Sequence, residues 1–451
     1  MTQSSTIQIL PEQLDQLVYQ AVFAESDQQK AAARYQIWQA ADQAGIILSS
    51  IHDFYMARGR EELPLNLTVP AINVRGMAYN TARAAFQAAV EQKVGAVIFE
   101  IARSEIGYTD QTPLEYVTVI SAAALRQGWS GPLFIQGDHF QAKSDKPGQP
   151  KTGEINKIKD LIKEAIEAGF YNIDIDMSTL VSLDKPREQE QQLPNAQYSA
   201  ELTDWIRSLE PAGVTVSVGG EIGHIGGKNS TAEDFIAFID QYRQFLPDQN
   251  KGMSKVSVQT GTHHGGVVLP NGELADVDVD FSILSKISKL ARDKYQIAGT
   301  VQHGASTLPD EFFAQFADSQ AIEVHLATGF QNIIMDHPAF PQDLLREMYQ
   351  WLEKNKLDEK KESQTMDQFY YKLRKKAWGQ FKKQVWDIPE EVQAKLRQAL
   401  TNRFKFMFDQ LNVKDTQQLV AQFVKPVRVE KGESDFLPRE NKQINTQGLA
   451  D

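Results

Sequence analysis

The stretch Phe134-Ile135-Gln136-Gly137-Asp138-His139 is a short run of strand-forming residues that ends in a carboxylate and an imidazole. Similar apolar runs recur at intervals of tens of residues and end in polar side chains at Glu221, at His263 and His264, at His303 and at His325. Parallel strands bring their carboxyl ends to a common rim. The repetition therefore predicts that these side chains gather at one rim, where they can share a metal ion.

Strand-like runs alternate with amphipathic helical stretches from about residue 68 to residue 330. The runs are residues 69–74, 96–101, 132–138, 172–177, 215–220, 255–261, 298–303 and 321–327. The alternation alone also permits an open doubly wound sheet, but such a sheet would concentrate polar residues at one crevice. Eight strands with their helices over roughly 260 residues match one barrel. We therefore predict an α/β fold, a (β/α)8 TIM barrel with N- and C-terminal helical extensions.

The same patterns divide the chain into four parts. Residues 1–66 are predicted to form an N-terminal helical extension, because apolar residues there recur at the spacing of one helical face. Residues 67–340 are predicted to form the barrel, and residues 341–435 a C-terminal helical extension with its own helical periodicity. The end of the chain, residues 436–451, is expected to be a flexible tail.

The composition favours a globular protein with neither a nucleic-acid nor a membrane partner. A net charge of −12 argues against nucleic-acid binding, and we interpret the basic, aromatic stretch 372–383 as a solvated helix face. The sequence has no apolar run long enough to span a membrane and no signal-peptide core, so we expect a cytoplasmic location. It also has no cysteine, which leaves His, Asp and Glu as the strong metal ligands.

Glycines next to the histidines indicate where a ligand could approach the backbone. His264 and His303 are each followed by glycine. At Gly265 and in Gly304-Ala305-Ser306, backbone N–H groups and a hydroxyl could hold an anion, although such glycines also serve simple tight turns. Three neutral imidazoles with one open coordination position would form a Lewis-acid site that polarises a carbonyl group.

Two acidic positions adjoin these histidines. Asp138 and His139 are neighbours, and neighbouring side chains point to opposite faces of a regular strand. We therefore expect the strand to end there, so that both side chains can serve one site. Glu221 opens a glycine-rich stretch, residues 221–227, which is expected to form a mobile loop over the site.

These motifs resemble those of the class II, zinc-dependent ketose-bisphosphate aldolases, the family that includes the fructose- and tagatose-bisphosphate aldolases. The resemblance spans about residues 68–335, and the chain is similar to a divergent member with extra helical termini. The matching motifs occur in the family's order and are Asp138-His139, Glu221-Ile222-Gly223-His224-Ile225-Gly226-Gly227, His264-Gly265 and His303-Gly304-Ala305-Ser306.

The resemblance implies an aldehyde-lyase of carbohydrate metabolism that makes or cleaves a carbon–carbon bond of a ketose phosphate or related polyol through a zinc-stabilised enediolate. Zinc would be held by His139, His264 and His303, with Glu221 as an alternate ligand. Asp138 would protonate the alkoxide or aldehyde oxygen. We expect the assembly to be a homo-oligomer. Contacts with substrate or phosphate would come from Asn73, Gly265, Gly304, Ser306, His325 and Thr328.

Two departures from the family pattern leave the substrate and the donor base open. Where the family has Asn-x-x-Thr, this chain has His325-Leu326-Ala327-Thr328. An acidic residue expected after the paired glycines is replaced around Lys228-Asn229-Ser230. The base that removes the proton from the donor substrate could then be Glu233, Asp234, His224 or His325.

Two alternative functions also stay open. The replaced residues favour a non-catalytic, aldolase-like partner subunit, whereas the complete set of ligands and acid argues against it. A metal-dependent isomerase or hydrolase could use the same barrel, because fold does not fix reaction. Asp174 and Asp176 on the fourth strand would allow a second mono- or divalent cation. The similarity of Asp176-Met177-Ser178 to the family's Asp-x-Ser motif favours the aldolase.

Overall fold

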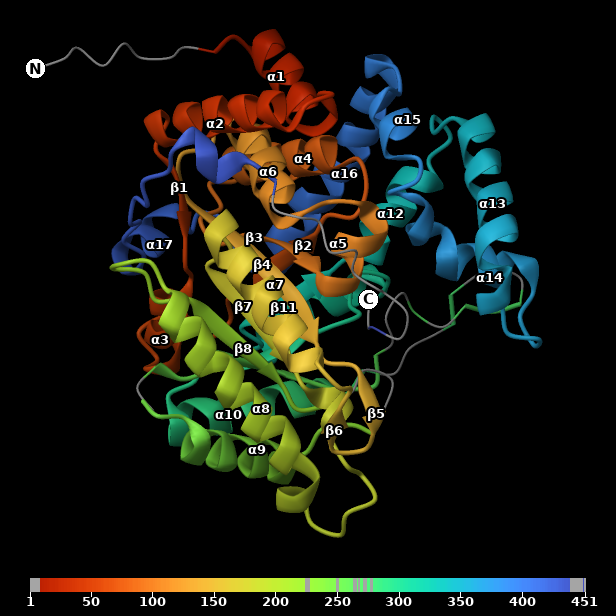
Figure 1. The fold of residues 1–451 in the computed structure, drawn as a ribbon. Coiled ribbons are helices and arrows are strands. Elements are labelled where there is room, and N and C mark those ends of the chain that lie inside the picture. The colour runs from red at the N-terminus through yellow and green to blue at the C-terminus, as the bar shows by residue number, and fades with distance from the viewer. Residues whose placement is uncertain are drawn as a thin grey trace, which may run out of the picture.

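The computed structural model describes residues 9–223, 228–248, 251–262, 266, 268–270, 274–275, 279–438 and 449. A ring of parallel strands lies at its centre (Figure 1). The strands are β2 (Val69–Asn73), β3 (Ile98–Ala102), β4 (Gly131–Gln141), β7 (Asn172–Asp176), β8 (Ser217–Glu221), β9 (Lys255–Val258), β10 (Thr300–Gln302) and β11 (Glu323–Leu326). Their order is β4-β3-β2-β11-β10-β9-β8-β7, and pairing of β7 with β4 closes the ring. Each strand falls on a predicted run, which confirms the TIM barrel.

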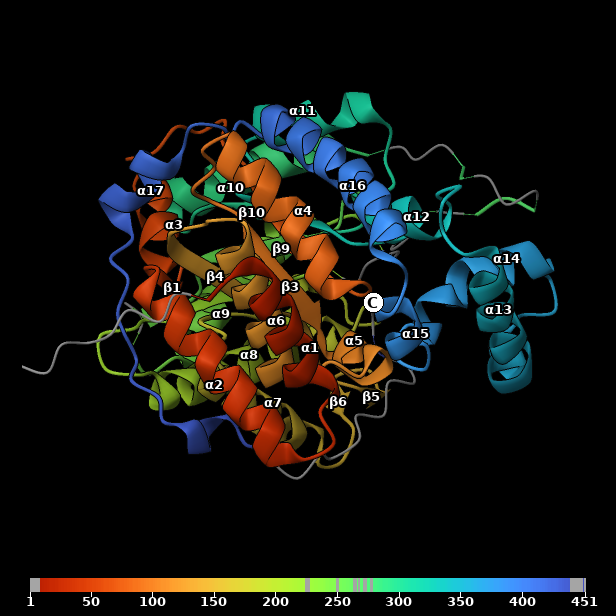
Figure 2. The same ribbon diagram turned by 90° about the horizontal axis from the view of Figure 1, so that it is seen from above.

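Helices follow the strands and cover the outside of the barrel (Figure 2). A side-chain cap at Thr112 and a capping box between Thr231 and Asp234 start two of them, and Gly169, with a φ of 119°, ends another. They are α4 (Ala78–Glu91), α5 (Arg103–Thr109), α6 (Pro113–Arg126), α7 (Glu154–Ala168), α8 (Glu188–Leu209), α9 (Ala232–Phe245), α10 (Phe281–Tyr295), α11 (Phe313–Asp318) and α12 (Thr328–Met335). Helix α8 contains Pro194, a residue that usually breaks a helix.

One additional strand contradicts the expectation that residues 10 to 60 are helical throughout. β1 (Ile46–Ser49) pairs in parallel with the first part of β4, from Gly131 onward. The side chain of Asn172 on β7 donates to the carbonyl of Ser49 at 3.3 Å and accepts from the N–H of Ile51 at 2.9 Å. β1 therefore occupies the space between β4 and β7 before these strands meet. Its short apolar run is too brief to distinguish from the helices around it by periodicity.

The terminal segments pack against the barrel helices. α1 (Pro11–Phe23) and α2 (Asp27–Gln43) lie on α6, and α16 (Glu390–Gln410) lies along α4 (Figure 2). These positions agree with helical extensions, while the boundaries at residues 66, 340 and 435 stay predictions. In the described part of the chain, no helix combines the length and apolarity needed to span a membrane. The other elements are α3 (His52–Gly59), α13 (Gln342–Lys356), α14 (Met366–Leu373), α15 (Lys382–Trp386), α17 (Gln417–Phe423) and the antiparallel pair β5 (Ser144–Lys146) and β6 (Gln149–Pro150).

The C-terminal extension reaches the barrel rim through Trp378. Its indole ring lies so close to Gly76 that a Cβ added there would come within 2.4 Å of the ring. The indole N–H also donates to Gln331 at 3.0 Å, on the first turns of α12. Gly76 lies three residues after β2 ends at Asn73, so residues far apart in the sequence jointly build this part of the rim.

Candidate metal centre

Asp138 and His139 both face the barrel interior because β4 carries a bulge. Between Gly137 and Phe140, two residues of β4 lie opposite one residue of β7. His139 has a φ of 41°, in the left-handed region, which turns its side chain to the same side as that of Asp138. The strand continues to Gln141, so the expectation that it ends at Asp138-His139 is wrong. A bulge rather than a strand end brings the two side chains into one site.

Gly137 makes room for this bulge. The ring of Phe140 folds back over it, and a Cβ at residue 137 would lie 2.5 Å from the ring. A larger residue would push the ring away and change the path of the strand. Gly137 therefore allows the bulge that orients the side chains of Asp138 and His139.

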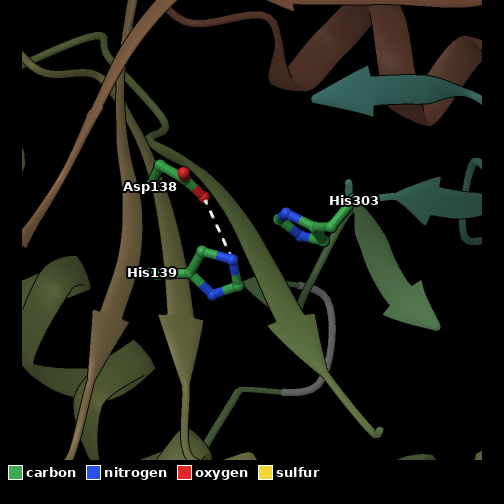
Figure 3. Close-up of side chains that lie close together, drawn as sticks. All are labelled: Asp138, His139 and His303. Carbon is green, nitrogen blue, oxygen red and sulfur yellow. Dashed lines mark ion pairs between the residues drawn. The ribbon is translucent and has the colours of Figure 1, made fainter. Parts of the chain in front are cut away.

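Asp138, His139 and His303 form a compact group of potential metal ligands (Figure 3). One donor atom from each lies within 4.8 Å of the others, and all three residues are buried. Asp138 Oδ1 lies 3.9 Å from His139 Nε2, and the centroids of the two imidazole rings are 4.3 Å apart. The structure thus brings together a predicted zinc ligand and the predicted acid from β4 with a second predicted ligand, His303, from the end of β10. The third predicted ligand, His264, lies outside the described residues, as do His263 and Gly265.

Two carboxylates hold the other side of the His139 ring. Its Nδ1 lies 2.9 Å from Asp176 Oδ2 and 3.1 Å from Glu221 Oε2. Asp176 also accepts from the backbone N–H of Ser178 at 3.0 Å and from its hydroxyl at 2.7 Å. Because a carboxylate can only accept, these contacts place a proton on Nδ1 and leave Nε2 for the interior of the site.

The two carboxyl groups that contact His139, those of Asp176 and Glu221, have different pKa values. Burial raises the pKa of Glu221 to about 7, assisted by the nearby charge of Asp176. Burial also acts to raise the pKa of Asp176, but its hydrogen bond with His139 outweighs this effect and lowers it to about 2. Asp176 therefore stays charged and orients the imidazole, whereas Glu221 can exist in either form near neutral pH.

His325 lies on the opposite side of Asp138. Its Nδ1 is 3.2 Å from Asp138 Oδ1 and 3.0 Å from Glu100 Oε2, and its Nε2 is 2.6 Å from Glu323 Oε1. The centroid of its ring lies 4.1 Å from that of His303. His325, expected to contact substrate, thus belongs to the same buried cluster. Of the other candidate donor bases, Asp234 caps α9 and His224 lies outside the described residues.

Three buried charged residues, Lys255, Asp174 and Glu323, lie next to His325. Lys255 Nζ lies 2.9 Å from Asp174 Oδ2, donates to Gln136 Oε1 at 2.8 Å and also pairs with Glu323. The hydroxyl of Tyr55 donates to the second oxygen of Glu323. Although burial opposes it, the charge of Lys255 lowers the pKa of Glu323 to about 2. Glu323 is therefore held as an anion.

Sequence reasoning missed the pairing of Lys255 with Glu323, although the sequence contained a signal for it. Lys255 begins the predicted run 255–261, and Glu323 lies within the predicted run 321–327. A charge at such a position must find a partner inside the protein. Glu323 and His325 are also two residues apart on one strand and therefore share its inner face.

Of the described residues expected to contact substrate or phosphate, Asn73, Gly304, Ser306 and Thr328 lie at the rim. Asn73 donates to Glu105 at 2.6 Å, and the same carboxyl group accepts from Arg75 at 2.6 Å. Arg75, which sequence reasoning missed, also donates to the hydroxyl of Thr328 at 3.1 Å. Its position directly after the predicted run 69–74 was the available signal.

The loop after β10 and the start of α12 touch each other closely. The Ser306 hydroxyl accepts from the N–H of Gly329 at 3.0 Å, and a Cβ on Gly329 would come 2.2 Å from the Ser306 carbonyl. Gly304 has a φ of 70°, which favours glycine. Ser306, Thr328 and Arg75 therefore form one continuous polar edge of the barrel.

Comparisons with known proteins bear on the family and the fold. The family described as "Fructose-bisphosphate aldolase class-II" matches residues 65–407. A search of curated proteins finds no match. The structure of a probable tagatose 6 phosphate kinase from Sinorhizobium meliloti 1021 covers 78% of this chain and 100% of its own, at 14% identity and a TM-score of 0.54. This level of similarity shows the fold.

Two further solved structures are similar over most of the chain. Fructose-bisphosphate aldolase from Campylobacter jejuni covers 82% of this chain and 97% of its own, at 17% identity and a TM-score of 0.49. The YdjI aldolase from Escherichia coli K12 covers 82% and 98%, at 14% identity and a TM-score of 0.47.

Proposed function

Because the chain belongs to the class II fructose-bisphosphate aldolase family, we propose that it is a metal-dependent aldolase acting on a ketose phosphate or related polyol. The observation that carries this proposal is the convergence of Asp138, His139 and His303 at one buried point. Metal-dependent cleavage of a carbon–carbon bond near a carbonyl group requires two components, a metal-binding site and an acid–base group.

The residues at this point fit a divalent metal. Two imidazoles and a carboxylate offer nitrogen and oxygen donors, a mixed set that suits zinc. Asp176 bonds to the outer nitrogen of His139, which is the usual way in which a ligand imidazole is oriented. We propose that His139, His303 and, from the sequence motif, His264 hold the ion, with Glu221 as an alternate ligand. A bound divalent ion would polarise the substrate carbonyl and offset negative charge that develops there.

Asp138 is proposed to move the proton. In the cleavage direction its carboxylate takes the proton of the substrate hydroxyl, the adjacent carbon–carbon bond breaks, and the aldehyde leaves. The electron pair of that bond stays on the donor fragment, which a proton must then quench. Asp138 is buried and lies within 3.2 Å of His325 Nδ1, so its orientation is fixed before substrate binds.

The polar edge formed by Arg75, Ser306 and Thr328 is proposed to hold a substrate phosphate. Arg75 supplies a positive charge and a planar set of donors suited to phosphate. Gly304 and Ser306 contribute backbone and hydroxyl donors. Asn73 lies beside Arg75 through their shared partner, Glu105.

The test is release of dihydroxyacetone phosphate from a panel of ketose phosphates, followed with a coupled reductase before and after chelation of metal. Chelator-sensitive release by the wild-type chain, restored by added Zn²⁺, is the expected result. If the metal-loaded chain cleaves none of these substrates, the alternative of a non-catalytic partner subunit is favoured. A metal-dependent isomerase would instead interconvert the substrates without releasing a three-carbon product.

A further inference from the structure

His325 presents a nitrogen to two carboxylates at once. Its Nε2 lies 2.6 Å from Glu323, and since a carboxylate can only accept, Nε2 must carry the proton there. Without a second proton, the imidazole turns the lone pair of Nδ1 toward Glu100 at 3.0 Å and Asp138 at 3.2 Å. Three acceptors facing one another at these distances repel unless a positive centre lies among them.

Glu100 supplies a second, independent observation. The residue is completely buried, and its Oε2 accepts from Gln136 at 3.0 Å. Within the described part of the chain, its other oxygen, Oε1, has no hydrogen-bond partner. The carboxyl group is turned toward His325, so an unsatisfied oxygen accompanies the one that already faces Nδ1. A buried carboxylate of this kind is normally paired or bound to a metal.

The nearby ammonium group is directed elsewhere. Lys255 Nζ pairs with Asp174 at 2.9 Å and with Glu323, on the side of His325 that carries Nε2. The charge of Lys255 therefore stabilises Glu323, the carboxylate at Nε2 of His325. The pair Glu100 and Asp138 lies on the other side, at Nδ1.

We infer that Glu100, Asp138 and His325 form a second divalent-cation site, next to the one at His139 and His303. One donor atom from each of the three residues lies within 4.8 Å of the others. Asp138 belongs to both groups, so the second ion would lie beside the carboxylate that is proposed to move the proton, while His139 and His303 hold the first ion. Glu323 takes the same position on His325 that Asp176 takes on His139, an outer carboxylate that fixes the imidazole. The nitrogen and oxygen donors suit Zn²⁺ or Mn²⁺.

This inference rests on the proposed function only in taking His139 and His303 as the first site. The experiment is equilibrium dialysis of the chelator-stripped full chain against Zn²⁺, and separately against Mn²⁺, with bound metal counted by mass spectrometry. The expected result is two ions per wild-type chain. Binding of a single ion would mean that a proton on His325 Nδ1 takes the place of the cation, and would overturn the inference.

Two variants assign the second ion. Glu100→Gln removes one carboxylate, and His325→Gln keeps a donor for Glu323 while removing the nitrogen that faces Asp138. Each variant is expected to bind one ion, and the surface variant Glu201→Gln on α8 is expected to bind two. Two ions in both site variants would overturn the assignment, and so would loss of both ions from either one.

The metal count separates this inference from the proposed function. Two ions with no cleavage of any ketose phosphate would remove the aldolase proposal and leave the second site in place. One ion with chelator-sensitive cleavage would remove the second site and support the aldolase proposal. Wild-type stoichiometry needs no variant, so the inference can fail even if a variant does not fold.

Discussion

The two sides of Asp138 are built alike but are encoded differently. On one side His139 bonds to Asp176 through its outer nitrogen, and on the other His325 bonds to Glu323 through its outer nitrogen. The first pair belongs to motifs that resemble the aldolase family. The second stands where that family has asparagine, and it rests on Lys255. The comparison shows an imidazole–carboxylate pair on each side of Asp138, and only the pair on the His139 side belongs to the motifs that resemble the family.

The largest effect is expected from removing a ligand on the His139 side. His303→Ala, or His139→Ala, should lose the first metal ion and abolish activity while leaving the fold intact. Loss of a metal that stabilises developing charge costs several kcal/mol, or roughly 10³-fold or more in rate. Metal content and turnover are the measurements, and His337→Ala, outside the cluster, is the matched control. Stoichiometric metal in both variants would remove these residues from the ligand set.

A substitution between the two sides should affect chemistry more than binding at the first site. Asp138→Asn should retain the ion at His139 and His303 yet reduce turnover by about 10²–10⁴-fold, because the proton-transferring group is gone. Steady-state kinetics alongside metal analysis would show this. Asp240→Asn, an exposed control, should behave as wild type. Unchanged turnover in Asp138→Asn would exclude Asp138 from the mechanism.

The two outer carboxylates offer the sharpest comparison of the sides. Asp176→Asn should weaken metal binding at the His139 side by about 10–100-fold, since an outer-shell partner sets the orientation and basicity of a ligand imidazole. Glu323→Gln should leave affinity at that side within error and weaken only the ion assigned to His325. Titration with Zn²⁺ distinguishes the two. Equal loss at both sides from either variant would mean that the cluster acts as a single unit.

The smallest effect is expected away from both sides, at the rim. Thr328→Val removes the hydroxyl that accepts from Arg75 and should raise KM for a phosphorylated substrate by about fivefold, corresponding to about 1 kcal/mol for one hydrogen bond. Metal content should not change. Thr118→Val, a buried threonine on α6, is the control for loss of a hydroxyl. A fall in kcat without a change in KM would argue against a role in binding phosphate.

The sequence was sufficient to predict the barrel and to identify candidate residues on the His139 side. All of the barrel strands overlap predicted runs, because parallel strands covered by helices are short, continuous apolar segments. Asp138, His139 and His303 were identified because polar residues ended those segments. The structure brings these three residues close together, while their roles stay proposals.

Other features could not be obtained from local patterns. The bulge depends on the pairing of β4 with β7, which lies beyond any single run, so the adjacent Asp138 and His139 were explained by a strand end. β1 is recognisable only through its pairing with β4. The contacts of Lys255 and Glu100 likewise arise from strands far apart in the sequence. Their partners are set by barrel closure, which propensities do not report.

The contact between Trp378 and Gly76 also has a consequence for protein synthesis. The ring that packs on Gly76 is added roughly 300 residues after it, which at about 5–20 residues per second takes about 15–60 s. During that interval the rim beside Arg75 lacks one of its walls. Nascent chains shorter than this point would expose apolar surface there and offer a binding site to chaperones. The site is therefore completed only after Trp378 has been synthesised.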